Sequence, residues 1–220
     1  MADGPREGEV AKQTALTALR QAIAAGDVAP GQRLVESELA EMFEVTRASV
    51  RAALIELTAD GLVERIPNRG ARVRVVTVDE AVAITECRMV LEGLCAAKAA
   101  ELATDEQIGQ LTELAERMRQ AVEDGEPLKY SVLNRDLHRM VQEYSGQTVA
   151  AELLHRLNAQ IVRHQFQLAL RSGRPHVSVT EHLAIVAAIA DRDPVAAEAA
   201  ARAHLRSVID ALREPVGGNE

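Results

Sequence analysis

Aromatic residues are scarce in this sequence, with two Phe, two Tyr and no Trp among 220 residues. Ala, Leu and Val are plentiful instead, which favours tightly packed helices. The two cysteines, Cys87 and Cys95, fit neither a CxxC motif nor a disulfide framework, so we expect buried thiols in a reducing compartment. A signal-peptide core and any apolar run of membrane-spanning length are also missing. We therefore expect a soluble, cytoplasmic protein with no membrane partner.

Acidic residues outnumber basic ones, and the excess lies in one part of the chain. The formal net charge is −8 at pH 7, but residues 1–76 carry 10 basic and 11 acidic side chains, and residues 77–220 carry 15 and 22. The length allows two modest domains, each with its own core. The first third is therefore nearly neutral, and a local basic cluster within it can still attract a phosphate backbone.

The stretch of residues 39–75 combines helical and β-type patterns in a defined order. Thr46 offers a side-chain cap for a helix whose apolar residues recur at helical spacing and which ends at Gly61. Two short β-type runs, 62–66 and 71–75, follow and are joined by a turn. A short helix, a tight turn, a second helix and a hairpin predict a winged helix-turn-helix.

Basic side chains concentrate in the same stretch, with six basic against three acidic residues from Arg47 to Arg74. A recognition helix presents its N-terminal residues to base edges, and a basic wing suits a groove or its phosphates. An ordinary solvated charged face remains the alternative for any single arginine. The residues predicted to bind DNA are Arg33, Ser37, Thr46, Arg47, Ser49, Arg51, Arg69 and Gly70.

Several short motifs in this region follow one another at a characteristic spacing. They are Pro30-Gly31-Gln32-Arg33-Leu34, Glu38-Leu39-Ala40, Val45-Thr46-Arg47, Val50-Arg51-Ala52-Ala53-Leu54, Leu57, Asp60-Gly61-Leu62-Val63 and Pro67-Asn68-Arg69-Gly70-Ala71. With these residues, about the first third of the chain resembles the DNA-binding domain of GntR-family bacterial transcription regulators. The resemblance implies a regulator that binds a double-stranded DNA operator.

The rest of the chain has helical patterns throughout, so we expect a mainly α fold. We expect a disordered arm over residues 1–8, a DNA-binding domain over 9–76 whose first helix spans Ala11–Ala25, an all-helical domain over 77–213 and a tail over 214–220. Capping boxes at Thr77–Glu80, Thr104–Gln107 and Ser178–Glu181, a cap at Asp193 followed by Pro194, and several glycines divide the second domain into a bundle of about six helices. These helices are expected at residues 80–102, 104–124, 127–144, 148–170, 178–190 and 194–212.

A second set of residues is spread along the helical part. It comprises Arg88, Leu91-Glu92, Ala96-Ala97, Asn134, Leu137-His138, Ser145-Gly146, Arg163, Glu181-His182, Ile185, Ala188-Ile189, Asp193, Ala196-Ala197 and His204-Leu205. In this order it resembles the FCD-type effector domain of the FadR-like branch of GntR regulators. The resemblance implies a homodimer whose hold on its operator changes when a small molecule enters the bundle. Since one helix-turn-helix reads too few base pairs for specificity, a dimer predicts a palindromic operator.

Three of the six histidines have positions that suggest a shared site. Asn134 and His138 are four residues apart and share a helical face. His182 and His204 lie eleven residues on either side of Asp193. In an antiparallel hairpin, equal arms rising about 1.5 Å per residue bring the two rings level. Inward-pointing side chains of this kind build metal sites in bundle cores. We interpret the other histidines, His155, His164 and His176, as surface or satisfied core residues.

Many FCD domains bind a divalent metal through an Asp or Asn and three His, and the resemblance implies that Asn134, His138, His182 and His204 form such a site. Imidazole-rich sets suit Zn²⁺ or Ni²⁺. Asn134 stands where Asp is more frequent, which removes one negative charge and favours an anionic, carboxylate effector. The resemblance further implies effector contacts from Arg88 and Arg163, although an ion pair between Arg88 and a carboxylate four residues later is an equal alternative.

Two other functions compete with an effector-responsive regulator. A metal on three histidines occurs in hydrolases, but no acid/base partner, nucleophile elbow or phosphate loop accompanies these residues, so we expect no enzyme. A DNA-binding protein in which the metal only staples the bundle is the second alternative, and effector-dependent release from DNA would separate it from a sensor.

Overall fold

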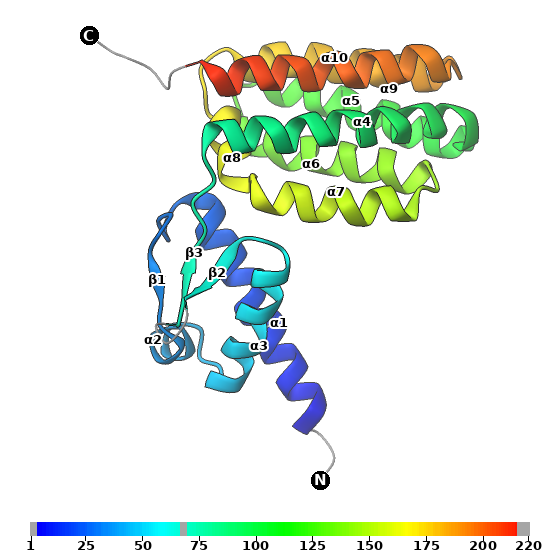
Figure 1. The fold of residues 1–220 in the computed structure, drawn as a ribbon. Helices are drawn as coiled ribbons and strands as arrows, with labels where there is room; N and C mark the ends of the chain where they lie inside the picture. Colours follow the sequence, from blue (N-terminus) through cyan, green and yellow to red (C-terminus); the bar gives the residue numbers. More distant parts are fainter. Residues whose placement is uncertain (1–3, 67–69, 215–220) are drawn as a thin grey trace. The chain divides into compact units, whose positions relative to one another are not determined.

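The computed structural model describes residues 4–66 and 70–214, which form two compact units. The first unit contains residues up to Thr77 together with Asn158–Arg163. The second unit contains the remaining residues from Val78 onward. Figure 1 shows the helices and strands of the two units.

The N-terminal unit has the winged helix-turn-helix topology that the sequence predicts. Its strands form a three-stranded antiparallel sheet in the order β1-β3-β2. Its elements are α1 Gly4–Ala25, β1 Arg33–Leu34, α2 Glu36–Met42, α3 Arg47–Ala59, β2 Val63–Ile66 and β3 Gly70–Val73. The two-residue strand β1 was not predicted, because two residues carry no alternating pattern, and it forms by pairing Arg33 with Arg72.

The core of this unit lies where α1 and α3 pack against each other and against the sheet. Its largest buried side chains include Leu16, Leu19 and Leu57. Thr46 caps α3 as predicted, since its Oγ1 accepts a hydrogen bond from the Ser49 backbone N–H at 3.1 Å. The cap and the buried face of α3 hold the start of the recognition helix at the surface.

The expectation of a disordered arm over residues 1–8 is wrong for residues 4–8, which belong to α1. The helix also begins well before the predicted start at Ala11. Glu7 lies in its first turn, where a carboxylate favours the helix N-terminus. Lys12 pairs with Glu9 at 2.7 Å and with Glu56 of α3 at 3.3 Å, so the first half of α1 is tied to the rest of the unit.

The second unit is an all-α bundle in which α4 and α10 run side by side (Figure 1). Thr104 and Gln107 form the predicted capping box, and Asp193 caps the last helix ahead of Pro194. The helices are α4 Val78–Leu102, α5 Asp105–Glu123, α6 Pro127–Tyr144, α7 Thr148–Gln160, α8 Val162–Ala169, α9 Arg174–Ala190 and α10 Pro194–Arg213. None of the helices in the part of the chain that the structure describes is long and apolar enough to cross a membrane.

Two helix predictions need correction. The single helix expected over 148–170 is divided at Ile161, which is buried, into α7 and α8. The reason is tertiary, since Ala159 and Val162 on either side pack into the N-terminal core. The helix expected from residue 178 begins at Arg174, and Glu181 lies in its middle, where it cannot serve in a capping box.

Candidate functional site

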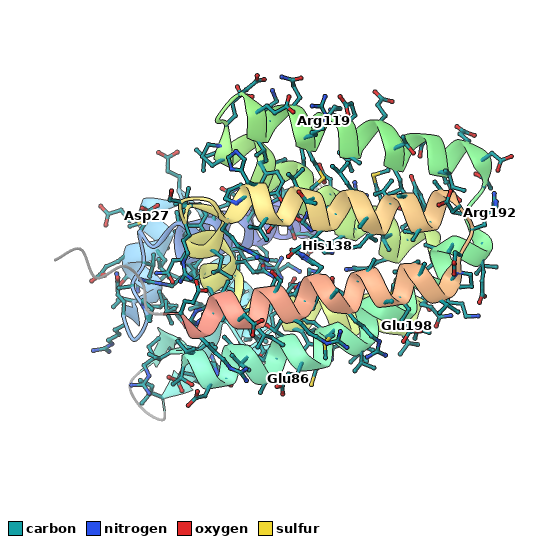
Figure 2. The ribbon with its side chains drawn as sticks, turned by 90° about the horizontal axis from the view of Figure 1, so that it is seen from above. Asp27, Glu86, Arg119, His138, Arg192 and Glu198 are labelled. Carbon is teal, nitrogen blue, oxygen red and sulfur yellow. The ribbon has the colours of Figure 1, made fainter. Side chains whose placement is uncertain are left out.

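Three histidines from three different helices meet inside the bundle. His138 comes from α6, His182 from α9 and His204 from α10, and their potential ligand nitrogens all lie within 4.8 Å of one another. In Figure 2 His138 lies in the interior, whereas the charged side chains of Glu86 and Arg119 lie on outer faces. His182 and His204 are almost fully buried, at 1% and 4% exposure.

The positions of two of the three rings agree with the helical hairpin that the sequence predicts around Asp193. The ring centroids of His182 and His204 are 4.3 Å apart, so the equal arms around Asp193 do bring them level. The His138 ring lies 5.1 Å from His182 and 5.5 Å from His204. The sequence pattern could not show that α6 would face this hairpin, and the structure brings it there.

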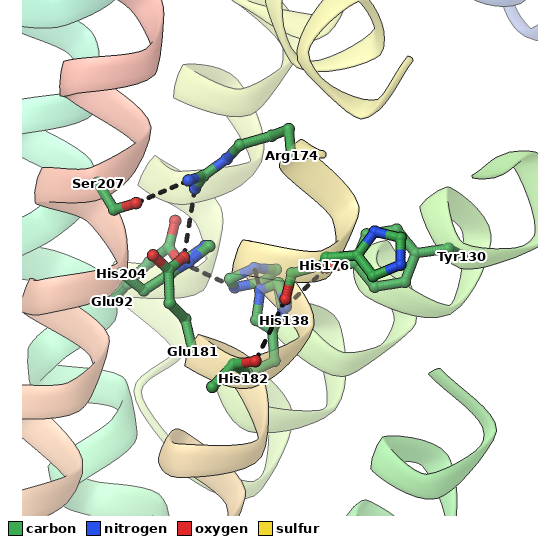
Figure 3. Close-up of polar contacts among 10 residues, drawn as sticks. Glu92, Tyr130, His138, Arg174, His176, Glu181, His182, His204 and Ser207 are labelled. Carbon is green, nitrogen blue, oxygen red and sulfur yellow. Dashed lines mark hydrogen bonds and ion pairs between the residues drawn. The ribbon is translucent and has the colours of Figure 1, made fainter. Parts of the chain in front are cut away.

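Each of the three rings has a protein partner at Nδ1 (Figure 3), which leaves Nε2 as the nitrogen available to a metal. His138 Nδ1 lies 2.9 Å from a Glu92 carboxylate oxygen, and His204 Nδ1 lies 2.7 Å from Glu181. His182 Nδ1 is 3.1 Å from the hydroxyl of Tyr130. Carboxylate partners of this kind fix the tautomer and orientation of metal-ligating histidines.

Both carboxylates are in turn held by an arginine. Arg88 donates to Glu92 from Nε at 3.0 Å and from Nη2 at 2.7 Å, and both side chains are buried. Arg174 donates to Glu181 at 3.2 Å and to Ser207 at 2.6 Å (Figure 3). Because each glutamate is matched by one arginine, the shell around the histidines adds no net charge.

Sequence reasoning weighed Arg88 as an effector clamp or as part of an ion pair, and the structure shows the ion pair. It missed the roles of Glu92, Glu181, Tyr130 and Arg174. Glu92 carried a signal, because it lies four residues after Arg88 on the same helix. Glu181 was interpreted as a capping residue, and its neighbour on α10 becomes evident only when the hairpin folds.

The protonation of these groups suits a metal site. Burial lowers the pKa of His182 well below its ordinary value, and the charges of His204 and His138 lower it further. Burial also lowers the pKa of His204, whereas the hydrogen bond to Glu181 raises it by a smaller amount. Burial alone would raise the pKa of Glu92, but Arg88 and His138 together hold it well below its usual range. Neutral rings at His182 and His204 beside an ionised Glu92 suit the binding of a divalent cation.

The geometry also fits a metal. The Nε2 atoms of His138 and His182 are 3.2 Å apart. Two imidazole nitrogens bound at about 2.0–2.1 Å would be separated by roughly 2.9 to 3.4 Å, depending on whether the coordination angle is octahedral or tetrahedral. Asn134, one turn before His138, has a buried Oδ1 without a hydrogen-bond partner among the described residues. An amide oxygen that has no other partner is a suitable fourth ligand.

A small cavity of about 20 Å³ opens beside His138, enough for roughly one water molecule. Its walls are mostly apolar and lie on α4, α6, α9 and α10. The lining residues are Glu92, Cys95, Ala96, Leu137, His138, Val141, Gln142, Ile185 and Ala201. Cys95 is buried as expected, but Cys87 is exposed, which corrects that part of the prediction.

Arg163 is not part of the histidine cluster. It lies in the segment Asn158–Arg163 that clusters with the N-terminal unit, and its Nη1 is buried with no partner among the residues that the structure describes. His155 is exposed on α7, which agrees with its interpretation as a surface residue.

The predicted DNA-binding residues lie at the start of α3, at α2 and on the sheet. Arg33, Ser37, Thr46, Arg47 and Arg51 are exposed. Ser49 is buried instead, with its Oγ 2.9 Å from Thr46 Oγ1, so it supports the cap and is not available to a base. Arg69 lies outside the described residues. Gly70 is exposed at φ +88°, a backbone angle that favours glycine.

A winged helix-turn-helix joined in one chain to an all-α domain with a buried polar centre defines a transcriptional regulator. Comparison with known families supports this class. Residues 11–73 match bacterial regulatory proteins of the gntR family, and residues 83–207 match the FCD domain. The chain belongs to the GntR family of bacterial regulators and carries an FCD domain, so it is a transcriptional regulator and not an enzyme.

Named relatives and a solved structure agree with this assignment. The HTH-type transcriptional repressor NanR of Klebsiella aerogenes is 32% identical over 213 residues, covering 86% of this chain and 80% of the relative. The HTH-type transcriptional repressor RspR of Escherichia coli K12 is 28% identical, covering 85% and 82%. The fold matches that of E. coli McbR/YncC with a TM-score of 0.80 at 22% identity, covering 92% of this chain and 96% of that one.

Proposed function

We propose that this chain is a metal-centred sensor that represses transcription and whose affinity for DNA changes when a small carboxylate enters the helical domain. The observation that carries the proposal is the convergence of three imidazole rings whose potential ligand nitrogens lie within 4.8 Å of one another, each ring with its Nδ1 held by a protein partner. Repression is proposed because the relatives RspR and NanR are named repressors.

In this proposal Asn134, His138, His182 and His204 hold one divalent ion, Zn²⁺ or Ni²⁺ by its preference for imidazole. When bound, the ion supplies a Lewis-acidic position for an oxygen of the effector. The four ligands are neutral, and Glu92 and Glu181 are each matched by an arginine. The positive charge of the centre is therefore uncompensated, which favours an anion.

The buried pair limits what Arg88 can do. Its Nε and Nη2 are both engaged by Glu92 and its side chain is 5% exposed, so an effector carboxylate could use only the buried end-on edge formed by Nη1 and Nη2. In the proposal, the main role of Arg88 is to keep Glu92 ionised, so that this carboxylate can hold His138 Nδ1. For Arg163 the supporting observation is its buried Nη1, and its effector contact remains a prediction.

On the DNA side we propose a homodimer that binds a palindromic operator through Arg47 and Arg51, with Arg33, Ser37, Thr46 and the wing residues Arg69 and Gly70 at the backbone or groove. The protein would have one conformation with high and one with low affinity for DNA. An effector shifts DNA affinity only by the difference in its own affinity for these two conformations. Light scattering at micromolar concentration should give the mass of a dimer, and a monomer both free and on DNA would rule out this arrangement.

The metal proposal is tested with His182→Ala, using His155→Ala on exposed α7 as a matched control. Elemental analysis should find about one metal per chain in the wild type and the control, and none in His182→Ala. Operator binding should persist in all three proteins, and release by a panel of small mono-, di- and tricarboxylates should be lost only in His182→Ala. Metal loss with no effector response in the wild type would favour the stapling role. An unchanged response in a metal-free variant would reject the sensor.

A further inference from the structure

One carboxylate lies among the basic residues of the DNA-reading surface. Glu36 is the first residue of α2, and it accepts hydrogen bonds from Arg51 of α3. Arg51 Nε lies 3.1 Å from both oxygens of Glu36, and Nη2 lies 2.7 Å from Oε2. The predicted base-reading arginine is therefore already engaged, by a residue that sequence reasoning did not select.

The environment of Glu36 is basic beyond this pair. The hydrogen bond from Arg51 lowers the pKa of Glu36, burial opposes it, and the charges of Arg51, Arg65 and Arg47 lower the pKa further. Glu36 therefore stays ionised at the pH of a DNA-binding reaction. An ionised carboxylate on a surface that meets phosphates weakens general DNA binding, so it needs a compensating role.

The geometry of the pair suggests that role. An arginine carries five N–H donors in a planar fork. Glu36 occupies the edge formed by Nε and one N–H of Nη2, which leaves the end-on edge formed by Nη1 and Nη2. A guanine O6/N7 pair takes two parallel donors of this kind. The pair thus holds the side chain of Arg51 in one orientation and leaves a complete guanine-reading fork.

We propose that Glu36 is a specificity-determining residue that acts through Arg51: it orients the arginine for guanine and keeps it from pairing with phosphate. This inference rests on the proposed operator binding. Two effects combine in it. Orientation lowers the conformational entropy that Arg51 loses on binding guanine. Pairing with Glu36 also keeps Nε and Nη2 of Arg51 away from phosphate, which weakens non-specific complexes, in which no guanine is positioned to compensate.

The test is selection from a pool of duplexes with a randomised 20-base-pair centre, carried out with the full-length protein and followed by sequencing. Wild type, Glu36→Gln and Glu38→Gln are compared. Glu38 lies exposed on the same helix, so Glu38→Gln removes the same charge as a matched control. The affinity of each protein for the best selected duplex and for a scrambled duplex is then measured over a range of salt concentrations.

For Glu36→Gln we expect the ratio of specific to scrambled affinity to fall about tenfold, which lies within the discrimination that one guanine contact provides. Guanine should also be enriched less at one symmetric pair of positions. Glu38→Gln should change both affinities alike and leave the ratio intact. Equal ratios for the two variants would overturn the inference, since Glu36 would then contribute only general charge. A wild type that enriches no sequence would instead reject the proposed operator binding itself.

Arg51→Lys gives a second, independent readout. Lysine keeps the charge but lacks the fork, so guanine enrichment should weaken at that symmetric pair of positions while scrambled affinity stays close to that of wild type. If Glu36 acts through Arg51, adding Glu36→Gln to Arg51→Lys should lower the specificity ratio no further. A double variant whose loss is the sum of the two single losses would show that Glu36 acts by another route.

Discussion

Two arginine–glutamate pairs in this chain have similar donor patterns and very different surroundings. Arg51 and Glu36, in the proposed DNA-reading surface, have side chains 58% and 30% exposed, whereas Arg88 and Glu92, in the bundle, are each 5% exposed. In both pairs Nε and Nη2 of the arginine face the carboxylate. Screening by water makes the exposed pair weak, so it can exchange partners with DNA. The buried pair is a fixed support for His138, because separating buried charges is costly.

This difference indicates a general distinction between the proposed DNA-reading surface and the buried histidine site. Polar groups that must release a partner and take up a ligand are kept in water, where the exchange costs little. Groups that must hold a ring nitrogen in one orientation are buried, where an unpaired charge is strongly disfavoured. The first predictions below test this distinction directly, and the later ones test single contacts within each surface.

The largest effect is expected for Glu92→Ala, which leaves Arg88 buried and unpaired and removes the partner of His138 Nδ1. We expect a loss of about 3–5 kcal/mol in the free energy of unfolding. Urea denaturation followed by circular dichroism measures it. Glu36→Ala removes the same group from the exposed pair and should leave the stability unchanged within error. Equal losses for the two variants would contradict the distinction.

A double replacement of the buried pair, Arg88→Met with Glu92→Leu, sharpens the same test. Because no unpaired charge remains, its free energy of unfolding should lie much closer to wild type than that of Glu92→Ala. Metal content should still fall, since His138 loses its orienting carboxylate. A double variant as unstable as Glu92→Ala would show that packing, and not charge, dominates at this position.

Next in size is the loss of a base contact in the exposed surface. Arg47→Ala and Arg51→Ala should each weaken binding to the selected duplex by about 5- to 150-fold, the range of a bidentate arginine–guanine pair. Both residues are exposed, so the melting temperature should not change. Titration of labelled duplex measures the affinity. Wild-type footprints from both variants would show that α3 is not the reading helix.

Asn134→Asp tests the electrostatics of the buried centre. The variant adds a negatively charged ligand in place of the amide, and we expect tighter metal binding by roughly tenfold, comparable with the smaller effects of altered metal-site partners. The added charge should weaken carboxylate binding to the loaded protein. Competition with a chromophoric chelator and calorimetric titration with carboxylates measure the two quantities. Weaker metal binding in this variant would place Asn134 outside the ligand set.

The smallest effect is expected at the start of the recognition helix. Thr46→Ala removes the hydrogen bond to the Ser49 backbone N–H and should cost about 1 kcal/mol of stability in the N-terminal unit. Thr58→Ala on the same helix is a suitable control, because its hydroxyl bonds only the backbone oxygen of Leu54 four residues earlier. Thermal unfolding of the two variants measures the difference, and equal losses would argue against a special role for the cap.

Short-range patterns in the sequence were sufficient for most of the fold. Thr46, the capping box at Thr104 and the cap at Asp193 each mark a helix start that the structure confirms, because a cap bonds to residues two or three positions away. The failures occur where distant packing decides. The pattern of 148–170 is continuous, yet the helix breaks at Ile161, within the segment Asn158–Arg163 that belongs to the N-terminal unit.

In the candidate metal site, too, some features follow from short-range patterns in the sequence and others from long-range packing. The sequence by itself determined that Asn134 and His138 share a face and that His182 and His204 are level, because both follow from helical rise and from one hairpin turn. Only the tertiary structure decided that α6 faces that hairpin, and that Glu92 and Glu181 hold His138 and His204. The same holds for Glu36 beside Arg51 at the surface. These contacts join residues 15 to 46 positions apart, between helices whose relative placement depends on the packing of the whole core.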